Sequence, residues 1–104
     1  MILATLPPAP ARIQVVAREF SLVPSRRTVK AGTAIVELAN FGEDAHDLRL
    51  QRIGGTKIYG VPTQQAGEVA DVQLRLRPGT YRLWCSIADH RARGMRTTLI
   101  VTRR

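Results

Sequence analysis

Residues 70–83 read ADVQLRLRPGTYRL, and this stretch decides the class of fold. Apolar residues at 70, 72, 74 and 76 alternate with polar ones, and Tyr81 and Leu83 alternate with Arg82 after the turn signal Pro78-Gly79. A period of two places every second side chain on the same face of a strand. The stretch therefore predicts two half-buried β-strands separated by a turn.

The same period recurs on both sides of this stretch. Further alternating pairs are Ile13 and Val15, Val36 and Leu38, Leu48 and Leu50, and Leu99 and Val101. Turn signals separate the runs at Ala31-Gly32, at 40–44 and at Gly54-Gly55. Short strands at this spacing predict an all-β fold, an antiparallel β-sandwich. The one helical turn that we expect lies within Val61–Glu68.

The length of 104 residues suits one domain, which we place at residues 12–104. Prolines at 7, 8 and 10 favour an extended, flexible segment over residues 1–11. No apolar run reaches the 18 or so residues of a membrane span, so we expect no transmembrane segment in this chain. A single cysteine excludes a disulfide-stapled miniprotein.

The charge balance is strongly basic, with 16 lysines and arginines against 8 acidic residues and a net charge of +8. Such a charge favours an anionic partner, whether nucleic acid, a membrane surface or an acidic protein. The five aromatic residues do not interleave with arginines along a strand, which weakens the case for nucleic acid.

The residues with metal-ligating side chains form one pattern. Cys85, His90 and Met95 are spaced as C-x4-H-x4-M, and the only other histidine, His46, lies upstream. His46 is in phase with the buried set of its strand, as is Cys85 with Tyr81 and Leu83. Two inward ligands at strand ends and two from one loop can make a single four-residue site.

The donor set is specific in its chemistry. One thiolate and two imidazoles with a weak axial thioether form the site of blue-copper electron-transfer proteins. Structural zinc usually takes more thiolates and no thioether, so this set fits zinc poorly. A multicopper oxidase needs more than the two histidines present, and a binuclear copper site of the oxidase-subunit type needs two cysteines. We therefore expect one copper ion, cycling between Cu(II) and Cu(I).

The sequence resembles the cupredoxins, the small blue-copper domains that include plastocyanin and azurin, over roughly residues 13–102. The segments that carry the resemblance are Asn40-Phe41-Gly42 followed by His46-Asp47, LRPGTY at 76–81, CSIADHRARGM at 85–95, and TTLIV at 97–101. The loop from Cys85 to Met95 with its upstream histidine is the specific part. The other segments are typical of many β-sandwiches.

The resemblance implies a Greek-key sandwich in which His46, Cys85 and His90 are equatorial copper ligands and Met95 is the axial one. It further implies that the Ala45 carbonyl approaches the metal from the opposite side. The exposed edge of His90 is then the expected electron port. Position 47 is an aspartate where plastocyanin and azurin carry asparagine.

We interpret the chain as an electron carrier, not an enzyme, which shuttles single electrons between larger redox proteins. Arg91, Arg93 and Arg96 surround the ligand loop and suggest an electropositive rim for a partner with an acidic docking surface. Trp84 is out of phase with Cys85, so it faces the other side of its strand, either under the N-terminal segment or as a partner contact. We expect a monomer and no nucleic-acid partner.

Two other functions remain open from the sequence. The first is a copper-trafficking or storage protein with the same ligands, and the second is a metal-free β-sandwich that docks on an anionic partner. For the copper carrier we expect an extracytoplasmic location, periplasmic or secreted, because ligation protects a thiol that oxidation would otherwise threaten there. No signal sequence is expected in this chain, since the apolar stretch at its start is short.

Overall fold

The computed structural model describes residues 8–103, which form nine strands and one short helix. In chain order the strands are β1 (Ala11–Arg18), β2 (Ser21–Pro24), β3 (Thr28–Lys30), β4 (Gly32–Asn40), β5 (His46–Arg52), β6 (Ile58–Gln64), β7 (Val69–Leu76), β8 (Gly79–Trp84) and β9 (Arg96–Thr102). The helix α1 (His90–Arg93) precedes β9. Residues 1–7 of the expected flexible segment lie outside the described residues, so that expectation stays a prediction.

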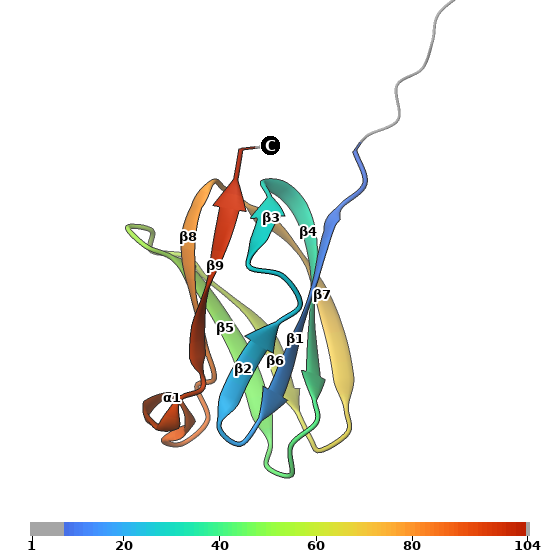
Figure 1. Cartoon of the computed structure of the whole chain (residues 1–104), viewed down its shortest axis with the longest axis vertical. Coiled ribbons are helices and arrows are strands. Elements are labelled where there is room, and N and C mark those ends of the chain that lie inside the picture. Colours follow the sequence, from blue (N-terminus) through green and yellow to red (C-terminus); the bar gives the residue numbers. More distant parts are fainter. Residues whose placement is uncertain (1–7, 104) are drawn as a thin grey trace, which may run out of the picture.

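The strands form two sheets packed face to face, as Figure 1 shows. One sheet has the order β2-β1-β4-β7, and the other has the order β3-β9-β8-β5-β6. The β-sandwich predicted from the alternation is confirmed. Each sheet is mixed, however, because β1 runs parallel to β4 and β3 runs parallel to β9. The alternation of side chains fixes the buried face of a strand but is the same for both strand directions.

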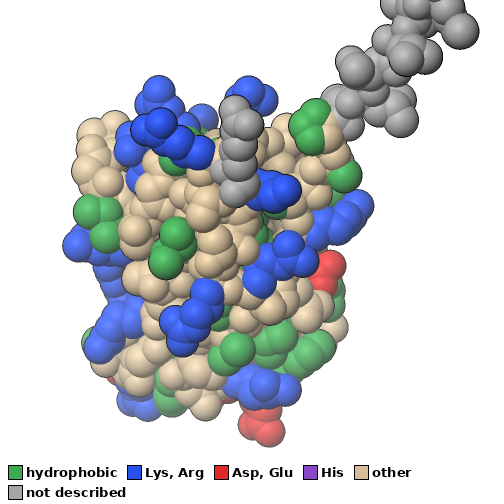
Figure 2. All heavy atoms as spheres, turned by 45° about the horizontal axis from the view of Figure 1, so that its top comes forward, with side chains coloured by type: hydrophobic (Ala, Val, Ile, Leu, Met, Phe, Trp, Pro, Cys, Tyr) green, Lys and Arg blue, Asp and Glu red, His purple; other side chains and the backbone are tan. Residues whose placement is uncertain are grey.

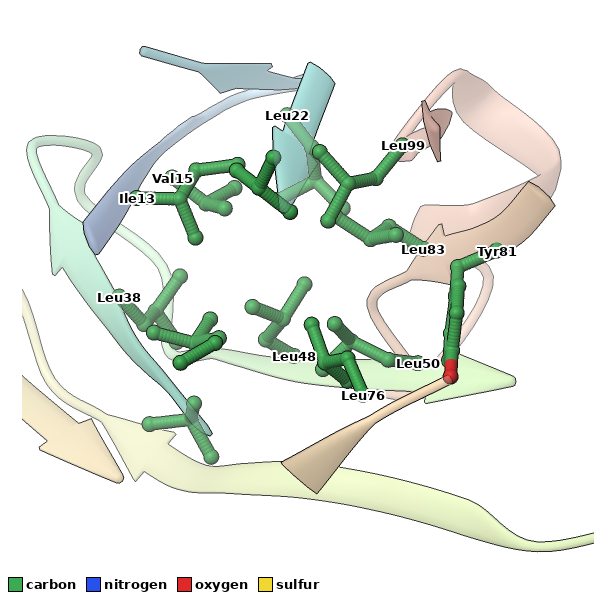
Figure 3. Close-up of a cluster of buried hydrophobic side chains, with 14 of the residues drawn as sticks. Ile13, Val15, Leu22, Leu38, Leu48, Leu50, Leu76, Tyr81, Leu83 and Leu99 are labelled. Atoms are coloured by element: carbon green, nitrogen blue, oxygen red, sulfur yellow. The ribbon is translucent and has the colours of Figure 1, made fainter. Parts of the chain in front are cut away.

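The core lies between the sheets and consists of the side chains that the alternation places inward (Figure 3). Leu50 of β5 and Leu83 of β8 lie opposite each other in the register and are both buried. The predicted inward residues that are buried include Ile13, Val15, Val36, Leu38, Leu48, Leu76, Tyr81, Leu99 and Val101. On β7 the alternation is also regular, with Ala70, Val72 and Leu74 half-buried and their polar neighbours exposed.

The helical turn expected within Val61–Glu68 is wrong. Residues 61–64 belong to β6, which pairs with β5 through Val61 opposite Leu48, so strand pairing decides the conformation there. The helix found among the described residues is α1 instead, inside the ligand loop. Four residues are too few for a helical period. The turn is closed by a backbone hydrogen bond from the Arg93 N–H to the Asp89 carbonyl, and an exposed ion pair joins the same two residues, four positions apart.

Tyr81 ties the turn before β8 to the core. Its ring is buried, and its hydroxyl oxygen accepts a hydrogen bond of 2.9 Å from the backbone N–H of Arg77. We expect Tyr81→Phe to lower the free energy of unfolding by about 1 kcal/mol, because the Arg77 N–H loses its acceptor. Urea unfolding measures the change. Tyr59→Phe is the control, since the Tyr59 hydroxyl donates to the Arg75 carbonyl at an exposed site. An equal loss in both variants would contradict the assignment.

Candidate metal centre

The four predicted ligands lie at one end of the sandwich, where β5 begins and β8 ends. His46 is the first residue of β5, and Cys85 follows the last residue of β8. His90 begins α1, and Met95 directly precedes β9. Figure 1 shows α1 and the turn between β4 and β5 together at this lower end. The fold therefore brings to one place residues that are up to 49 positions apart in the sequence.

Three of the predicted donor atoms converge on one point. The Nδ1 atoms of His46 and His90 are 3.2 Å apart, and the Cys85 Sγ is 3.9 Å from the first and 3.7 Å from the second. Around a trigonal metal, bonds of about 2.0–2.1 Å to nitrogen and about 2.3 Å to sulfur place the two nitrogens about 3.5–3.6 Å apart and the sulfur about 3.7–3.8 Å from each nitrogen. The side chains of His46, Cys85 and His90 are all buried, and their ligand atoms lie close enough together to bind one metal ion. The two S···N distances are close to those of a trigonal metal site with two nitrogen ligands and one sulfur ligand, and the N···N distance is about 0.3 Å shorter than such a site needs.

Met95 closes the loop that carries this triangle. Its backbone N–H donates to the His90 carbonyl at 3.1 Å, and its own carbonyl accepts from the Cys85 N–H, also at 3.1 Å. The Met95 side chain is buried. Two backbone hydrogen bonds thus fix Met95 against both Cys85 and His90, as expected of a loop that folds back over the strand ends.

Asp47 anchors the residue after the cysteine. The Asp47 carboxylate accepts a 2.6 Å hydrogen bond from the Ser86 N–H and a second one from the Ser86 hydroxyl. Asp47 is buried between His46 and Leu48, which are buried as well, and its carboxylate also lies 3.4 Å from the Nε of Arg49, two positions further along β5. The aspartate at this position therefore holds the chain next to the Cys85 thiol from the neighbouring strand.

Burial raises the pKa of the Cys85 thiol above its ordinary value, and the negative charge of Asp47 raises it further, against the opposing effect of backbone hydrogen bonds. The thiol is therefore protonated at neutral pH when no cation is near. A thiolate is the form that binds metals, so a cation at the centre of the triangle supplies the charge that this buried sulfur needs to ionise.

The turn between β1 and β2 covers both imidazoles, which the sequence did not reveal. One carboxylate oxygen of Glu19 accepts from the N–H groups of Glu43 and Asp44 at 2.6 and 2.5 Å, and the other lies 3.6 Å from the His46 Nε2. Among the described residues this buried nitrogen has no hydrogen-bond partner. The Phe20 ring lies 5.3 Å from the His90 ring, centroid to centroid.

The expected exposed edge of His90 is much reduced. His90 is only 6% exposed, because Phe20 covers its ring and the Asp44 carboxylate lies 3.6 Å from its Nε2. His46, Cys85 and Met95 are 0% exposed. His90 is thus the only one of the four candidate ligands that reaches the surface.

The rim around the ligand loop, expected to be electropositive, carries both basic and acidic side chains. Arg93 pairs with Asp89 at 2.8 Å, and Glu19, Glu43 and Asp44 lie at the same end of the sandwich. The Arg91 guanidinium lies 4.5 Å from the Trp84 ring centroid. Trp84 does face away from Cys85, as predicted, but Arg91 contributes to its cover and the ring is only 9% exposed. A sequence pattern does not show which acidic residues the fold brings beside a basic loop.

No protein-family model matches the sequence, and no curated protein matches it. Solved structures do. Auracyanin from Roseiflexus castenholzii superposes with a TM-score of 0.72 at 17% identity, over 91% of this chain and 99% of that one. Auracyanin A from Chloroflexus aurantiacus, described as a "blue" copper protein, gives 0.71 at 16% identity, over 90% and 100%.

A multicopper oxidase also matches, with a TM-score of 0.69 at 16% identity, over 92% of this chain but only 45% of the oxidase. At these identities the likeness establishes the fold. The chain therefore has the cupredoxin fold, in agreement with the resemblance of the segments around His46 and Cys85.

Proposed function

We propose that this chain is a small blue-copper electron carrier that binds one type 1 copper ion through His46, Cys85, His90 and Met95. The observation that carries the proposal is the buried triangle of two Nδ1 atoms and one Sγ, with sides of 3.2, 3.9 and 3.7 Å. One thiolate and two imidazoles at trigonal spacing, beside a methionine, are the donors of such a site. The likeness to auracyanin A agrees with this proposal.

The residues of the chain contribute a fixed and dry coordination cage. Copper, when bound, supplies a one-electron couple between Cu(II) and Cu(I). The two imidazoles present Nδ1 to the centre and the thiol loses its proton there. The backbone bonds of Met95 and the Asp47–Ser86 contact hold the ligand loop in place. Because the ligands need not move, little reorganisation accompanies a change of charge.

His90 and the Phe20 ring over it form the route by which electrons enter and leave. His90 is the candidate ligand with exposed surface, and the Phe20 ring lies against it at an angle of 55°, with the Arg93 guanidinium 4.8 Å from the Phe20 ring centroid. The partners are larger redox proteins that dock at this end of the sandwich, and the mixed charges there set their orientation. The carrier acts as a monomer with no substrate turnover of its own.

Burial of the ligands favours a carrier over a trafficking or storage protein. A protein that hands copper to an acceptor must let ligands of that acceptor reach the metal, and here three of the four candidate ligands, Cys85, His46 and Met95, are fully buried. A fast, reversible one-electron couple supports the carrier, whereas ready transfer of copper to an acceptor protein would favour trafficking. We place the protein outside the cytoplasm, where the buried, ligated thiol resists oxidation. None of the described helices is long and apolar enough to cross a membrane.

Titration of the reduced apoprotein with Cu(II) tests the metal site. We expect an intense visible band that saturates at one copper per chain. Affinity should rise with pH, because binding releases the proton of a thiol whose pKa is raised by burial. One proton released corresponds to about a tenfold gain in affinity per pH unit. Weak absorption without saturation, or an affinity independent of pH, would contradict the proposed site.

A further inference from the structure

The positive charge of the molecule is unevenly divided between its two sheets. Among the described residues, the four-stranded sheet carries Arg12, Arg18 and Arg75 but also the acidic Glu37 and Asp71. The strands of the five-stranded sheet carry Lys30, Arg49, Arg52, Arg82 and Arg96, and their one acidic residue, Asp47, is buried. The excess of basic charge therefore belongs mainly to the five-stranded sheet and not to the ligand loop.

The outward side chains of this sheet form a continuous face. In the register, Arg96 of β9, Trp84 of β8 and Arg49 of β5 make one row. The next row is made by Thr98, Arg82, Gln51 and Ile58. Ile100 follows beyond Thr98, and Ile58 and Ile100 are 52% and 48% exposed. We call Arg49, Arg82, Arg96, Ile58 and Ile100 the basic sheet face.

The basic sheet face lies on a side of the sandwich, whereas the metal centre lies at its end. Figure 2, with the end opposite to the metal centre turned forward, shows basic side chains spread over the surface in view and acidic ones toward its edges. A partner seated on the basic sheet face would therefore leave the end with Phe20 and His90 open. The basic sheet face therefore lies apart from the end at which we propose that a redox partner docks.

The side chains of this face suit an anionic lipid better than a nucleic acid. Single strands of nucleic acid bind by stacking bases on exposed aromatic rings, and the one aromatic ring in these rows, Trp84, is only 9% exposed beside Arg91. Exposed isoleucines among arginines instead match the boundary between headgroups and acyl chains, where apolar side chains insert and cations meet phosphates.

We propose that the basic sheet face docks the protein on an anionic phospholipid membrane. The arginines approach the lipid phosphates, Ile58 and Ile100 enter the headgroup layer, and the metal centre faces sideways along the membrane surface. The negative surface potential attracts each lysine or arginine that comes within about a Debye length, about 8–10 Å. This proposal does not depend on copper and stands or falls separately from the proposed electron transfer.

Co-sedimentation of the full chain with vesicles tests the proposal. We expect binding to mixed phosphatidylcholine–phosphatidylglycerol vesicles, loss of binding in high salt, and none to pure phosphatidylcholine. Arg82→Gln combined with Arg96→Gln should lower the partition coefficient about 25-fold, about fivefold for each arginine near the surface. The matched control, Arg12→Gln with Arg75→Gln, removes the same charge from the four-stranded sheet and should change binding far less.

A second pair of variants tests the apolar contribution without changing the charge. Ile58→Thr with Ile100→Thr keeps β-branched side chains on the strands and should weaken vesicle binding severalfold. Circular dichroism checks that each variant is folded. The proposal is overturned if wild type ignores the anionic vesicles at low salt, or if both arginine pairs lose binding equally. It is also overturned if a single-stranded oligonucleotide binds more tightly than the vesicles and depends on Arg82 and Arg96.

Discussion

We expect Cys85→Ala to abolish the intense visible band of the copper-loaded protein and to lower its copper affinity by at least about a hundredfold. The band arises from charge transfer between the thiolate and Cu(II), and Cys85 is the only cysteine of the chain. Alanine leaves the two imidazoles in place, so residual copper would bind with weak absorption. Visible absorption and electron spin resonance on samples titrated with Cu(II) measure both effects.

Met95→Leu is the informative companion to this variant. An axial thioether is a weak ligand that tunes the reduction potential rather than holding the metal. The Met95→Leu protein should therefore keep the intense band, with a shifted potential, because leucine fills a similar buried volume. If Cys85→Ala kept the band, or Met95→Leu abolished copper binding altogether, the proposed roles of the two sulfur ligands would be wrong.

The apoprotein should stay folded when Cys85 is replaced by alanine, so a loss of copper binding reports on the metal site. Cys85 is buried and belongs to the hydrophobic core, where a small apolar residue is tolerated. The pKa of its thiol is raised in the folded state, so folding favours the neutral thiol over the thiolate. The folded apoprotein should therefore lose stability as the pH rises into the alkaline range. Unfolding measured without metal should show that Cys85→Ala removes this alkaline loss.

The sequence was sufficient to predict the sandwich and the clustering of His46, Cys85 and His90 for a physical reason. In strands the side chains alternate strictly, so Leu48, Leu50 and Leu83 report the buried face, and His46 and Cys85 share it. The same rule carries no information on strand direction, so the parallel pairing of β1 with β4 was missed. It also does not show that Asp47, which is out of phase with His46 and Leu48, is buried like them.

The cover over the metal centre could not be predicted because it depends on contacts between distant segments. Glu19 and Phe20 lie in a turn whose local sequence shows no sign of a site, and they reach His46 and His90 only after the sheets pack. The sequence likewise shows three arginines in and directly after the ligand loop but not the acidic groups that the fold brings beside them. The uneven charge of the two sheets could not be predicted without the strand order, and the alternation of side chains does not provide that order.

Glu19→Ala should lower copper affinity by about 10–100-fold, although Glu19 is not a ligand. Carboxylates that approach the outer nitrogen of a ligating histidine orient its ring, and their loss typically costs that much in metal affinity. One oxygen of the Glu19 carboxylate accepts hydrogen bonds from the N–H groups of Glu43 and Asp44, which fix the carboxylate in place. The other oxygen faces the His46 Nε2. Isothermal titration with Cu(II) measures the affinity.

Two further substitutions separate the position of this carboxylate from its charge. Glu43→Ala removes an exposed acidic side chain from the same end of the molecule and should leave the affinity nearly unchanged, which makes it the matched control. Gly42→Ala should resemble Glu19→Ala, because an added Cβ would collide with the Glu19 Oε2 and must displace the carboxylate. Equal losses of copper affinity in Glu19→Ala and Glu43→Ala would show that Glu19 acts only through its negative charge and not through its position.

The pH dependence of the unfolding free energy tests the position of the Glu19 carboxylate without any metal. The backbone N–H of Asp44 lowers the pKa of Glu19 below its ordinary value; burial opposes this effect, and the backbone N–H of Glu43 adds to the lowering. A lowered carboxyl pKa contributes stability that is fully present above the ordinary value of about 4.3 and is lost as the pH falls through the lowered one. The difference in unfolding free energy between wild-type apoprotein and Glu19→Ala should therefore be constant near neutral pH and shrink in acid. A difference that grew on acidification would show that the carboxylate does not accept these hydrogen bonds in solution.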